Sequence, residues 1–180
     1  MTEFNEIVRA RRSIRNYEER MVPDEILYKI LDTVKWTPSW ANTQCWEIIV
    51  VKDAGIKIRL QGAMEKTNPA WKSLAAAPVV LAVCGKLESA GYYKGSVTTK
   101  FGDWFLFDLG LASQTLCLAA QNEGLGTVIT GLFDHDKAKE VLKVPAGYEL
   151  VSLIPMGYPA KTPSVPKRRD TEEFVHKETF

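Results

Sequence analysis

The sequence predicts one domain in which helices alternate with β-strands, an α/β protein whose strand directions the sequence leaves open. The chain has 180 residues, enough for one domain and too few for two full ones. With 46% hydrophobic and 25% charged residues it can bury a proper core. The predicted elements follow in the order helices, strand, helix, strand, helix, strand, helix, strand, without an internal repeat.

The N-terminal part is predicted to hold three helices and one strand. The first helix runs into the basic segment 11–15, and the second is opened by Pro23 and closed by Pro38. The β-branched segment 47–52 predicts a strand, after which Asp53 caps a short helix. The apolar positions that define these helices are Phe4, Ile7 and Val8, then Ile26, Leu27, Ile30, Leu31 and Val34, and then Ile56, Leu60 and Met64.

One long apolar helix dominates the middle of the chain. The segment 79–84 is apolar throughout and predicts a strand. The helix-length segment 103–122 is apolar on nearly all sides, so we expect it to be central and covered by a sheet or by a second subunit. Gly124 and Gly126 stop this helix.

The C-terminal part adds two strands and a helix before its composition changes. We expect a short strand over 127–130, a helix from Asp134 through Leu142 and a strong strand over 149–156. The segment 157–180 is polar and punctuated by prolines, which favours an extended chain running over a surface.

Composition and charge exclude several classes of function. The formal net charge is +1, which argues against a protein that grips nucleic acid by charge alone. Three cysteines without CxxC spacing and two histidines argue for a reducing compartment and against a structural metal. The N-terminus lacks a signal peptide, and the longest apolar run is shorter than the roughly 18 residues of a membrane helix. We therefore expect a cytoplasmic protein.

A basic cluster is the most informative motif. Arg11, Arg12 and Arg15 surround Ser13 at the expected end of the first helix, and Lys167 to Arg169 form a second basic group. Guanidinium groups and a hydroxyl suit phosphate oxygens, and an opposite orientation of Ile14 would let Ser13 and Arg15 face one pocket. The alternative is a solvated helix end whose basic residues suit the helix dipole.

Two further segments are candidates for ligand binding. The loop 38–46 is dense in amides, hydroxyls and indoles, and its Asn42 and Gln44 can read the edges of a heterocycle, whereas Trp46 is better explained as a core anchor. Gly131 would let the backbone approach a ligand, although a plain connection from strand to helix is the alternative. The Gly124-x-Gly126 pair is not a dinucleotide fingerprint, because it follows a helix and lacks the third glycine.

Taken together and in this order, the motifs resemble those of the FMN-dependent nitroreductase family, over nearly the whole chain. They are Arg11-Arg12-Ser13-Ile14-Arg15, the loop 38–46, Asp108-Leu109-Gly110-x-Ala112, Gly124-Leu125-Gly126, Gly131 before Phe133-Asp134, Gly157-Tyr158-Pro159 and Pro166-Lys167-Arg168-Arg169. The resemblance implies an α+β fold with a mostly antiparallel sheet, over a single domain of residues 1–180. It also implies an intertwined homodimer with FMN at the subunit interface, in which the arm 157–180 embraces the partner.

The resemblance also implies roles for individual residues. Arg11, Lys167 and Arg169 would hold the FMN phosphate, Arg12 and Ser13 would lie near phosphate and ribityl, and Arg15 near the pyrimidine edge. Ser39, Trp40 and Asn42 would reach FMN from the other subunit, while Gly131 and Leu132 would offer backbone N–H groups to N5 and O4. Pro38, Gln44, Asn68 and Thr130 complete the expected cofactor site, and Trp40 and Tyr92 would line the substrate side. Cys45 departs from the family, which commonly has proline between Gln and Trp.

The implied activity is a ping-pong reaction in which FMN takes a hydride from NADH or NADPH and reduces nitroaromatics, quinones or similar flat acceptors. No catalytic acid, base or nucleophile from the protein is expected. A flavin reductase or dehalogenase-like enzyme on the same fold remains an alternative, as does a non-catalytic flavin-binding or sensory protein. A basic-patch binding module without a cofactor is a further alternative.

Overall fold

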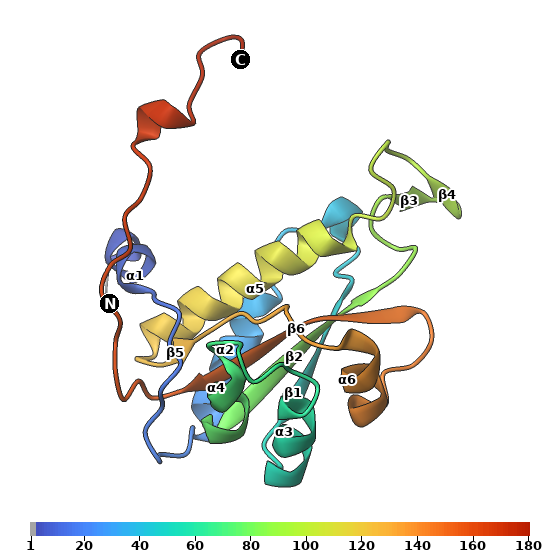
Figure 1. The fold of residues 1–180 in the computed structure, drawn as a ribbon. Helices are drawn as coiled ribbons and strands as arrows, with labels where there is room; N and C mark the ends of the chain where they lie inside the picture. Colours follow the sequence, from blue (N-terminus) through green and yellow to red (C-terminus); the bar gives the residue numbers. More distant parts are fainter. Residues whose placement is uncertain (1–2) are drawn as a thin grey trace.

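A four-stranded sheet forms the centre of the computed structural model, which describes residues 3–180 (Figure 1). The strand order is β1-β2-β6-β5, and every neighbouring pair is antiparallel. The sheet strands are β1 (Trp46–Val51), β2 (Val79–Lys86), β5 (Gly126–Thr127) and β6 (Tyr148–Gly157), and a separate hairpin consists of β3 (Tyr92–Tyr93) and β4 (Ser96–Val97). The helices are α1 (Phe4–Ala10), α2 (Asp24–Val34), α3 (Ala54–Gln61), α4 (Trp71–Ala76), α5 (Phe105–Asn122) and α6 (His135–Leu142), with 3₁₀ turns at Trp40–Asn42 and Thr171–Glu173. The antiparallel sheet confirms the expected α+β fold.

The strand β2 is apolar throughout because helices cover both faces of the sheet. Its residues Val79, Leu81 and Val83 pack in one core with α2 and α5. The residues between them face the opposite way, as the two-residue period of a strand requires, and pack with α3, α4 and α6 in a second core. Figure 1 shows α5 running across one side of the sheet while these three helices gather on the other.

The helix boundaries follow the local signals in the sequence. The side chains of Asp53 and Asp134 accept hydrogen bonds from the N–H groups of Ile56 at 2.7 Å and of Lys137 at 3.0 Å, so both capping predictions are confirmed. The helix α5 ends at Asn122, and Gly124 follows two residues later with a left-handed φ of 74°. There the N–H of Leu125 donates back to the carbonyl of Ala120 at 2.8 Å, which closes the helix end.

Three parts of the fold differ from the prediction. The expected strand 127–130 is wrong in extent, because pairing with β6 stops after Thr127 and resumes only as a bridge between Thr130 and Leu153. Pro155 of β6 lies between these two points and has no N–H to donate, which explains the interruption. The helix α4 and the hairpin β3–β4 are additional elements that the sequence patterns did not predict.

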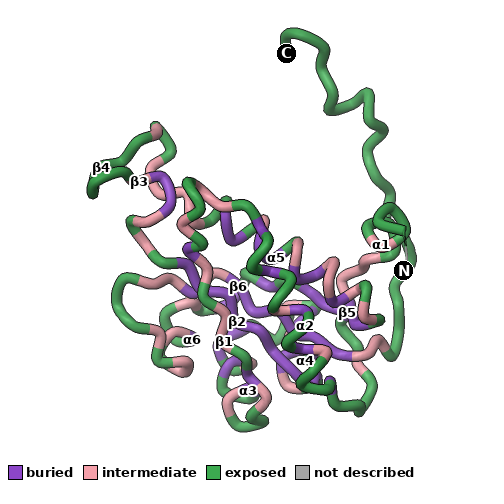
Figure 2. Tube along the Cα trace, turned by 180° about the vertical axis from the view of Figure 1, so that it is seen from behind, coloured by how far each residue is buried: buried purple, intermediate pink, exposed green. Residues whose placement is uncertain are grey.

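The two ends of the chain lie at the surface. The helix α1 buries no residue, and the arm after Ala160 is exposed along its whole length (Figure 2). Both views show the arm passing α1 and then leaving the body of the molecule. Over residues 3–180, the helices are all too short or too polar to span a membrane.

Candidate functional site

Ile14 holds the basic segment against the edge of the sheet. Its side chain is only 2% exposed, and its N–H donates to the carbonyl of Thr127 at 2.9 Å. Gly126 makes room for it, because a Cβ at that position would lie 2.4 Å from Cγ1 of Ile14. With Ile14 pointing inward, the half-buried Ser13 and the exposed Arg15 lie on either side of it at the surface, as the sequence predicted.

The segment around the start of α4 joins the basic segment to the turn after β5. The buried hydroxyl of Ser73 donates to the carbonyl of Arg15 at 3.1 Å. The side-chain amide of Asn68 donates to the carbonyl of Leu132, also at 3.1 Å. The segment 68–73 thus links the backbone of Arg15 to the turn at Leu132, and we call Ser13, Arg15, Asn68, Gly131 and Leu132 together the ledge.

The turn at Gly131 presents two backbone N–H groups. On one side of it, Thr130 and Leu153 exchange backbone hydrogen bonds of 3.0 and 2.9 Å. On the other side, the carbonyl of Gly131 lies 3.0 Å from Nε2 of His135. Gly131 and Leu132 are exposed, and within residues 3–180 their N–H groups have no hydrogen-bond acceptor. The turn can therefore donate to an acceptor from outside the chain.

The polar loop 38–46 is anchored by a carboxylate inside α5. Asp108 is 1% exposed and accepts the N–H of Trp40 with both oxygens, at 3.0 and 3.2 Å. Beyond this anchor, Ala41, Asn42 and Gln44 have positive φ values of 43°, 56° and 47°. Three non-glycine residues in the left-handed region within four positions raise the conformational free energy of the loop. Such backbone strain is typical of ligand-binding segments.

Aromatic side chains connect this loop to the hairpin β3–β4. The ring centroids of Trp40 and Trp104 are 5.1 Å apart, and those of Trp104 and Phe107 are 5.2 Å apart. The N–H of Trp104 donates to the carbonyl of Ala90 at the base of the hairpin. Tyr92 lies half-buried on this hairpin, two residues after Ala90, and its place on the substrate side stays a prediction.

Cys45 occupies the position where the family commonly has proline, and the structure shows what replaces it. The thiol is 3% exposed and its Sγ lies 3.6 Å from a carboxylate oxygen of Asp108, to which it donates. Burial, and next the negative charge and hydrogen bond of Asp108, raise the pKa of the Cys45 thiol to about 12. Cys45 is thus a second support for the carboxylate that anchors the loop.

The buried thiols predict a loss of stability at alkaline pH. The folded state keeps the Cys45 proton up to a pKa of about 12, whereas an unperturbed thiol loses it near 9.0. The unfolded state therefore binds fewer protons above about pH 9, and the free energy of unfolding falls as pH rises from there. Urea titrations between about pH 8 and 10.5 measure this slope, which Cys45→Ser should flatten because serine keeps a donor to Asp108 without ionising. Equal slopes in both proteins would contradict this account.

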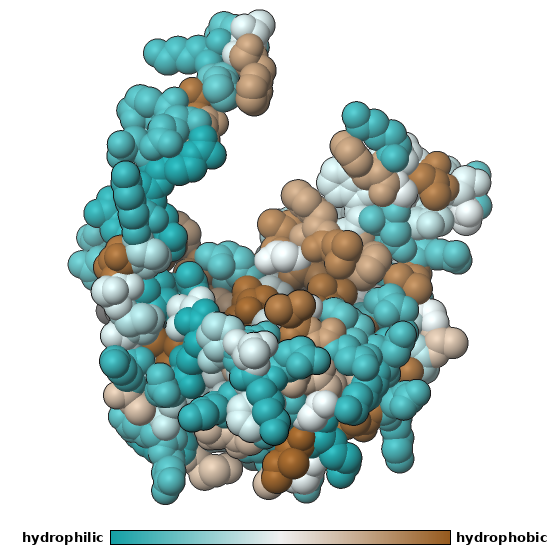
Figure 3. Space-filling model, in the orientation of Figure 1, coloured by the Kyte–Doolittle hydropathy of each residue, from teal (hydrophilic) through white to brown (hydrophobic). Residues whose placement is uncertain are grey.

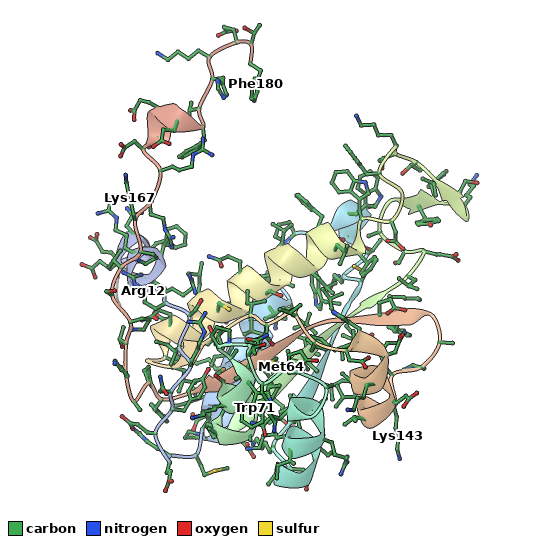
Figure 4. All side chains as sticks on the ribbon, viewed as in Figure 1. Arg12, Met64, Trp71, Lys143, Lys167 and Phe180 are labelled. Atoms are coloured by element: carbon green, nitrogen blue, oxygen red, sulfur yellow. The ribbon has the colours of Figure 1, made fainter. Side chains whose placement is uncertain are left out.

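The candidate residues fall into two groups in one chain. The ledge lies near β5, whereas the loop 38–46 lies at the N-terminal end of α5 (Figure 1). Arg11 and Arg12 are half-buried, and Arg12 donates to the carbonyls of Arg9 and Arg11. Figure 4 shows Arg12 and Lys167 on the same side of the molecule, beside α1. Lys167, Arg168 and Arg169 line a surface cavity with Phe174, and among the described residues no side chain of the first basic segment lines it.

Three residues that position the candidate site were missed by sequence reasoning. Asp108 appeared only as part of a helix motif, Ser73 was not considered, and His135 was weighed only as one of two histidines that argue against a metal site. A charged residue on the buried stripe of an apolar helix is a signal that could have identified Asp108. Ser73 carries no such signal, because its partner is the backbone carbonyl of a distant segment. His135 lies only four residues after Gly131, so its closeness to the glycine turn is a signal that could have been used.

The fold and the ledge define a class of protein. It is an α+β protein with a four-stranded antiparallel sheet, a long apolar helix and an arginine-rich edge with two available N–H groups. A family model described as the nitroreductase family matches residues 8–73 and 58–158. The chain therefore belongs to the nitroreductase family.

Individual relatives agree with this assignment. The chain is 32% identical to a putative NADH dehydrogenase/NAD(P)H nitroreductase of Methanothermobacter thermautotrophicus, over 88% of this chain and 78% of that protein. It is 26% identical to human iodotyrosine deiodinase 1, over 96% of this chain and 68% of that protein. Among solved structures, it resembles an FMN-dependent nitroreductase of Clostridium difficile R20291 with a TM-score of 0.80 and 26% identity, covering 97% of this chain and 98% of that one.

Proposed function

We propose that this chain is an FMN-dependent oxidoreductase that uses NADH or NADPH to reduce nitroaromatics, quinones or similar flat electron-poor acceptors. The observation that carries the proposal is the ledge of a nitroreductase-family protein, where the segment 68–73 bonds both to the backbone of Arg15 and to a turn whose two N–H groups have no acceptor in the described chain. A solved relative is named as FMN-dependent, and a sequence relative is named as an NAD(P)H nitroreductase.

The donors of the ledge fit the polar edge of a flavin. Gly131 and Leu132 offer N–H groups, Asn68 retains a second amide hydrogen, and Arg15 offers a guanidinium group. Thr130 fixes the start of the turn through its hydroxyl, which donates to the carbonyl of Leu153 at 2.6 Å. When bound, FMN would supply the redox chemistry, accepting a hydride from the nicotinamide and passing electrons to the acceptor in a ping-pong cycle. The protein's part is to bind, orient and stabilise negative charge.

A second copy of the chain would complete the site. The helix α5 is apolar on its outer side, where Leu106 and Phe107 are each 58% exposed, and Gly110 has nothing within 4 Å of a Cβ built on it. Figure 3 shows hydrophobic surface over α5, in the hollow between the arm and the hairpin β3–β4. We propose that a partner subunit covers this face and brings its Pro38, Ser39, Trp40, Asn42 and Gln44 to the ledge. The arm 157–180 would then reach around the partner with Lys167 and Arg169.

The two arginines at the ends of the basic segment are expected to have different roles. Arg11→Ala should mainly weaken FMN retention, because a phosphate contact is lost, by roughly tenfold or more. Arg15→Ala should instead lower the flavin midpoint potential and slow hydride transfer, because the reduced flavin is anionic. FMN titration, spectroelectrochemistry and stopped-flow reduction by NADH measure the three quantities. If both variants only loosen FMN, the electronic role of Arg15 is wrong.

Steady-state oxidation of NADH and NADPH tests the activity. Turnover that depends on added nitrofurazone or menadione supports the proposed function. A bound flavin that neither nicotinamide reduces would contradict it. Reductive dehalogenation is the second candidate, favoured by the 26% identity to human iodotyrosine deiodinase 1 over 96% of this chain. Iodotyrosine added to the dithionite-reduced protein distinguishes it, since only a dehalogenase releases iodide.

A further inference from the structure

His135 is the first residue of α6, and its ring lies between two backbone carbonyls. Nε2 is 3.0 Å from the carbonyl oxygen of Gly131 in the turn, and Nδ1 is 2.8 Å from that of Leu150 in β6. The ring also stacks on the buried Phe133, with centroids 4.1 Å apart and an interplanar angle of 26°. The imidazole is therefore fixed in place by β6 and by Phe133, and it reaches the turn from a rigid support.

The geometry of a peptide bond makes this contact matter for the ledge. In a trans peptide, the carbonyl of one residue and the N–H of the next point in opposite directions. A donor on the Gly131 carbonyl therefore fixes the direction of the Leu132 N–H. In the same way, the bond of 2.9 Å from the Leu153 N–H to the Thr130 carbonyl fixes the direction of the Gly131 N–H.

Each of the two free N–H groups thus has its own support. The sheet orients the N–H of Gly131, whereas a side chain outside the sheet orients that of Leu132. The carbonyl of Leu132 accepts from Asn68 at 3.1 Å, so the peptide that follows is held as well. Because the turn is exposed and carries a glycine, the Leu132 N–H would otherwise be free to rotate.

We propose that His135 is a positioning residue for the cofactor site, in that its Nε2–H donates to the Gly131 carbonyl and aims the Leu132 N–H at the flavin. This inference rests on the proposed function for the identity of the ligand. The contact with the turn itself is a property of the chain alone. Both partners of the ring are carbonyl oxygens, so donating to both requires a proton on each nitrogen, whereas a neutral imidazole carries one N–H. The proposal requires that Nε2 hold a proton.

The protonation of the ring is tested first, without FMN. Long-range ¹H–¹⁵N spectra of the apo protein should show the His135 Nε2 signal of a protonated nitrogen, and His135→Phe identifies the signal by its loss. A His135 Nε2 without a proton would overturn the proposal, because the ring could not donate to Gly131.

Three substitutions then test the effect on FMN. His135→Phe keeps a ring for stacking on Phe133 and removes both donors, while glutamine and asparagine place an amide near the positions of Nε2 and Nδ1 respectively. We expect the FMN dissociation constant to rise about tenfold in His135→Phe and His135→Asn, and by less than about threefold in His135→Gln. Asp136→Ala, an exposed neighbour on the same helix, is the control and should leave FMN affinity unchanged.

The outcomes separate the two proposals. Wild-type protein that takes up no FMN would overturn the proposed function, and with it the cofactor role of His135. Wild-type protein that binds FMN, with equal affinity in all three His135 variants, would overturn the inference alone. Thermal unfolding of each variant shows whether a change in affinity merely reflects loss of the fold, in which case glutamine would not restore binding selectively.

Discussion

Gly110→Trp is expected to produce a folded monomer that no longer retains FMN. Nothing lies within 4 Å of a Cβ at Gly110, so the indole should not disturb the subunit itself. In the proposed dimer, by contrast, the bulky side chain would hold the two α5 helices apart. Sedimentation should show a dimer dissociation constant that rises by at least about tenfold, and FMN affinity should fall with it.

The control for this substitution is Ile58→Trp. Ile58 is also an exposed apolar residue, at 59%, but it belongs to α3 on the other side of the sheet. That variant should remain dimeric and yellow. A Gly110→Trp protein that stays dimeric with full FMN would show that α5 is not at the subunit interface.

Gly126→Ala is expected to destabilise the fold and to weaken FMN binding together. The added Cβ would lie 2.4 Å from Cγ1 of Ile14, which is too close for any real contact. Overpacking of this kind costs about 1–3 kcal/mol, or roughly 2–12 °C in the melting temperature of a chain of this size. Because Ile14 fixes Ser13 and Arg15 at the ledge, its displacement should also move them.

A double-mutant cycle separates this clash from a general effect of alanine. Ile14→Ala removes Cγ1 and Cγ2, two of the three atoms nearest to the added Cβ. Gly126→Ala should therefore cost less in the Ile14→Ala background than in the wild type. Equal costs in the two backgrounds would mean that the packing of Ile14 on Gly126 does not carry the effect.

The pattern of the sequence predicted the main elements because local signals specify them. The caps at Asp53 and Asp134 and the stop at Gly124 depend on neighbouring residues only, and the structure confirms them. The short helix α4 has no side-chain cap and is held by its buried Ser73 and Leu74. The hairpin β3–β4 turns at Lys94 and Gly95, whose φ values of 50° and 76° are positive, and this two-residue glycine turn is a signal that was not used. The interruption of the pairing with β6 at Pro155 depends on the partner strand, so it has no local signal.

The candidate site was predictable in part for a related reason. Arginine clusters and glycine turns are visible in a sequence, and in the structure Ser73 and Asn68 bond to the backbone carbonyls of Arg15 and Leu132. Side chains that act through backbone carbonyls, such as His135 on Gly131 four residues earlier, are harder to recognise, because a sequence does not show the direction in which a carbonyl points. The cofactor contacts themselves stay a prediction, because the proposed site involves a second subunit and a ligand.

The absorption spectrum of the purified protein tests the central claim most directly. The account predicts a yellow protein with a flavin spectrum, which releases FMN on denaturation and whose apo form takes FMN up again. A colourless protein that does not bind added FMN would contradict it, even though the chain belongs to the nitroreductase family.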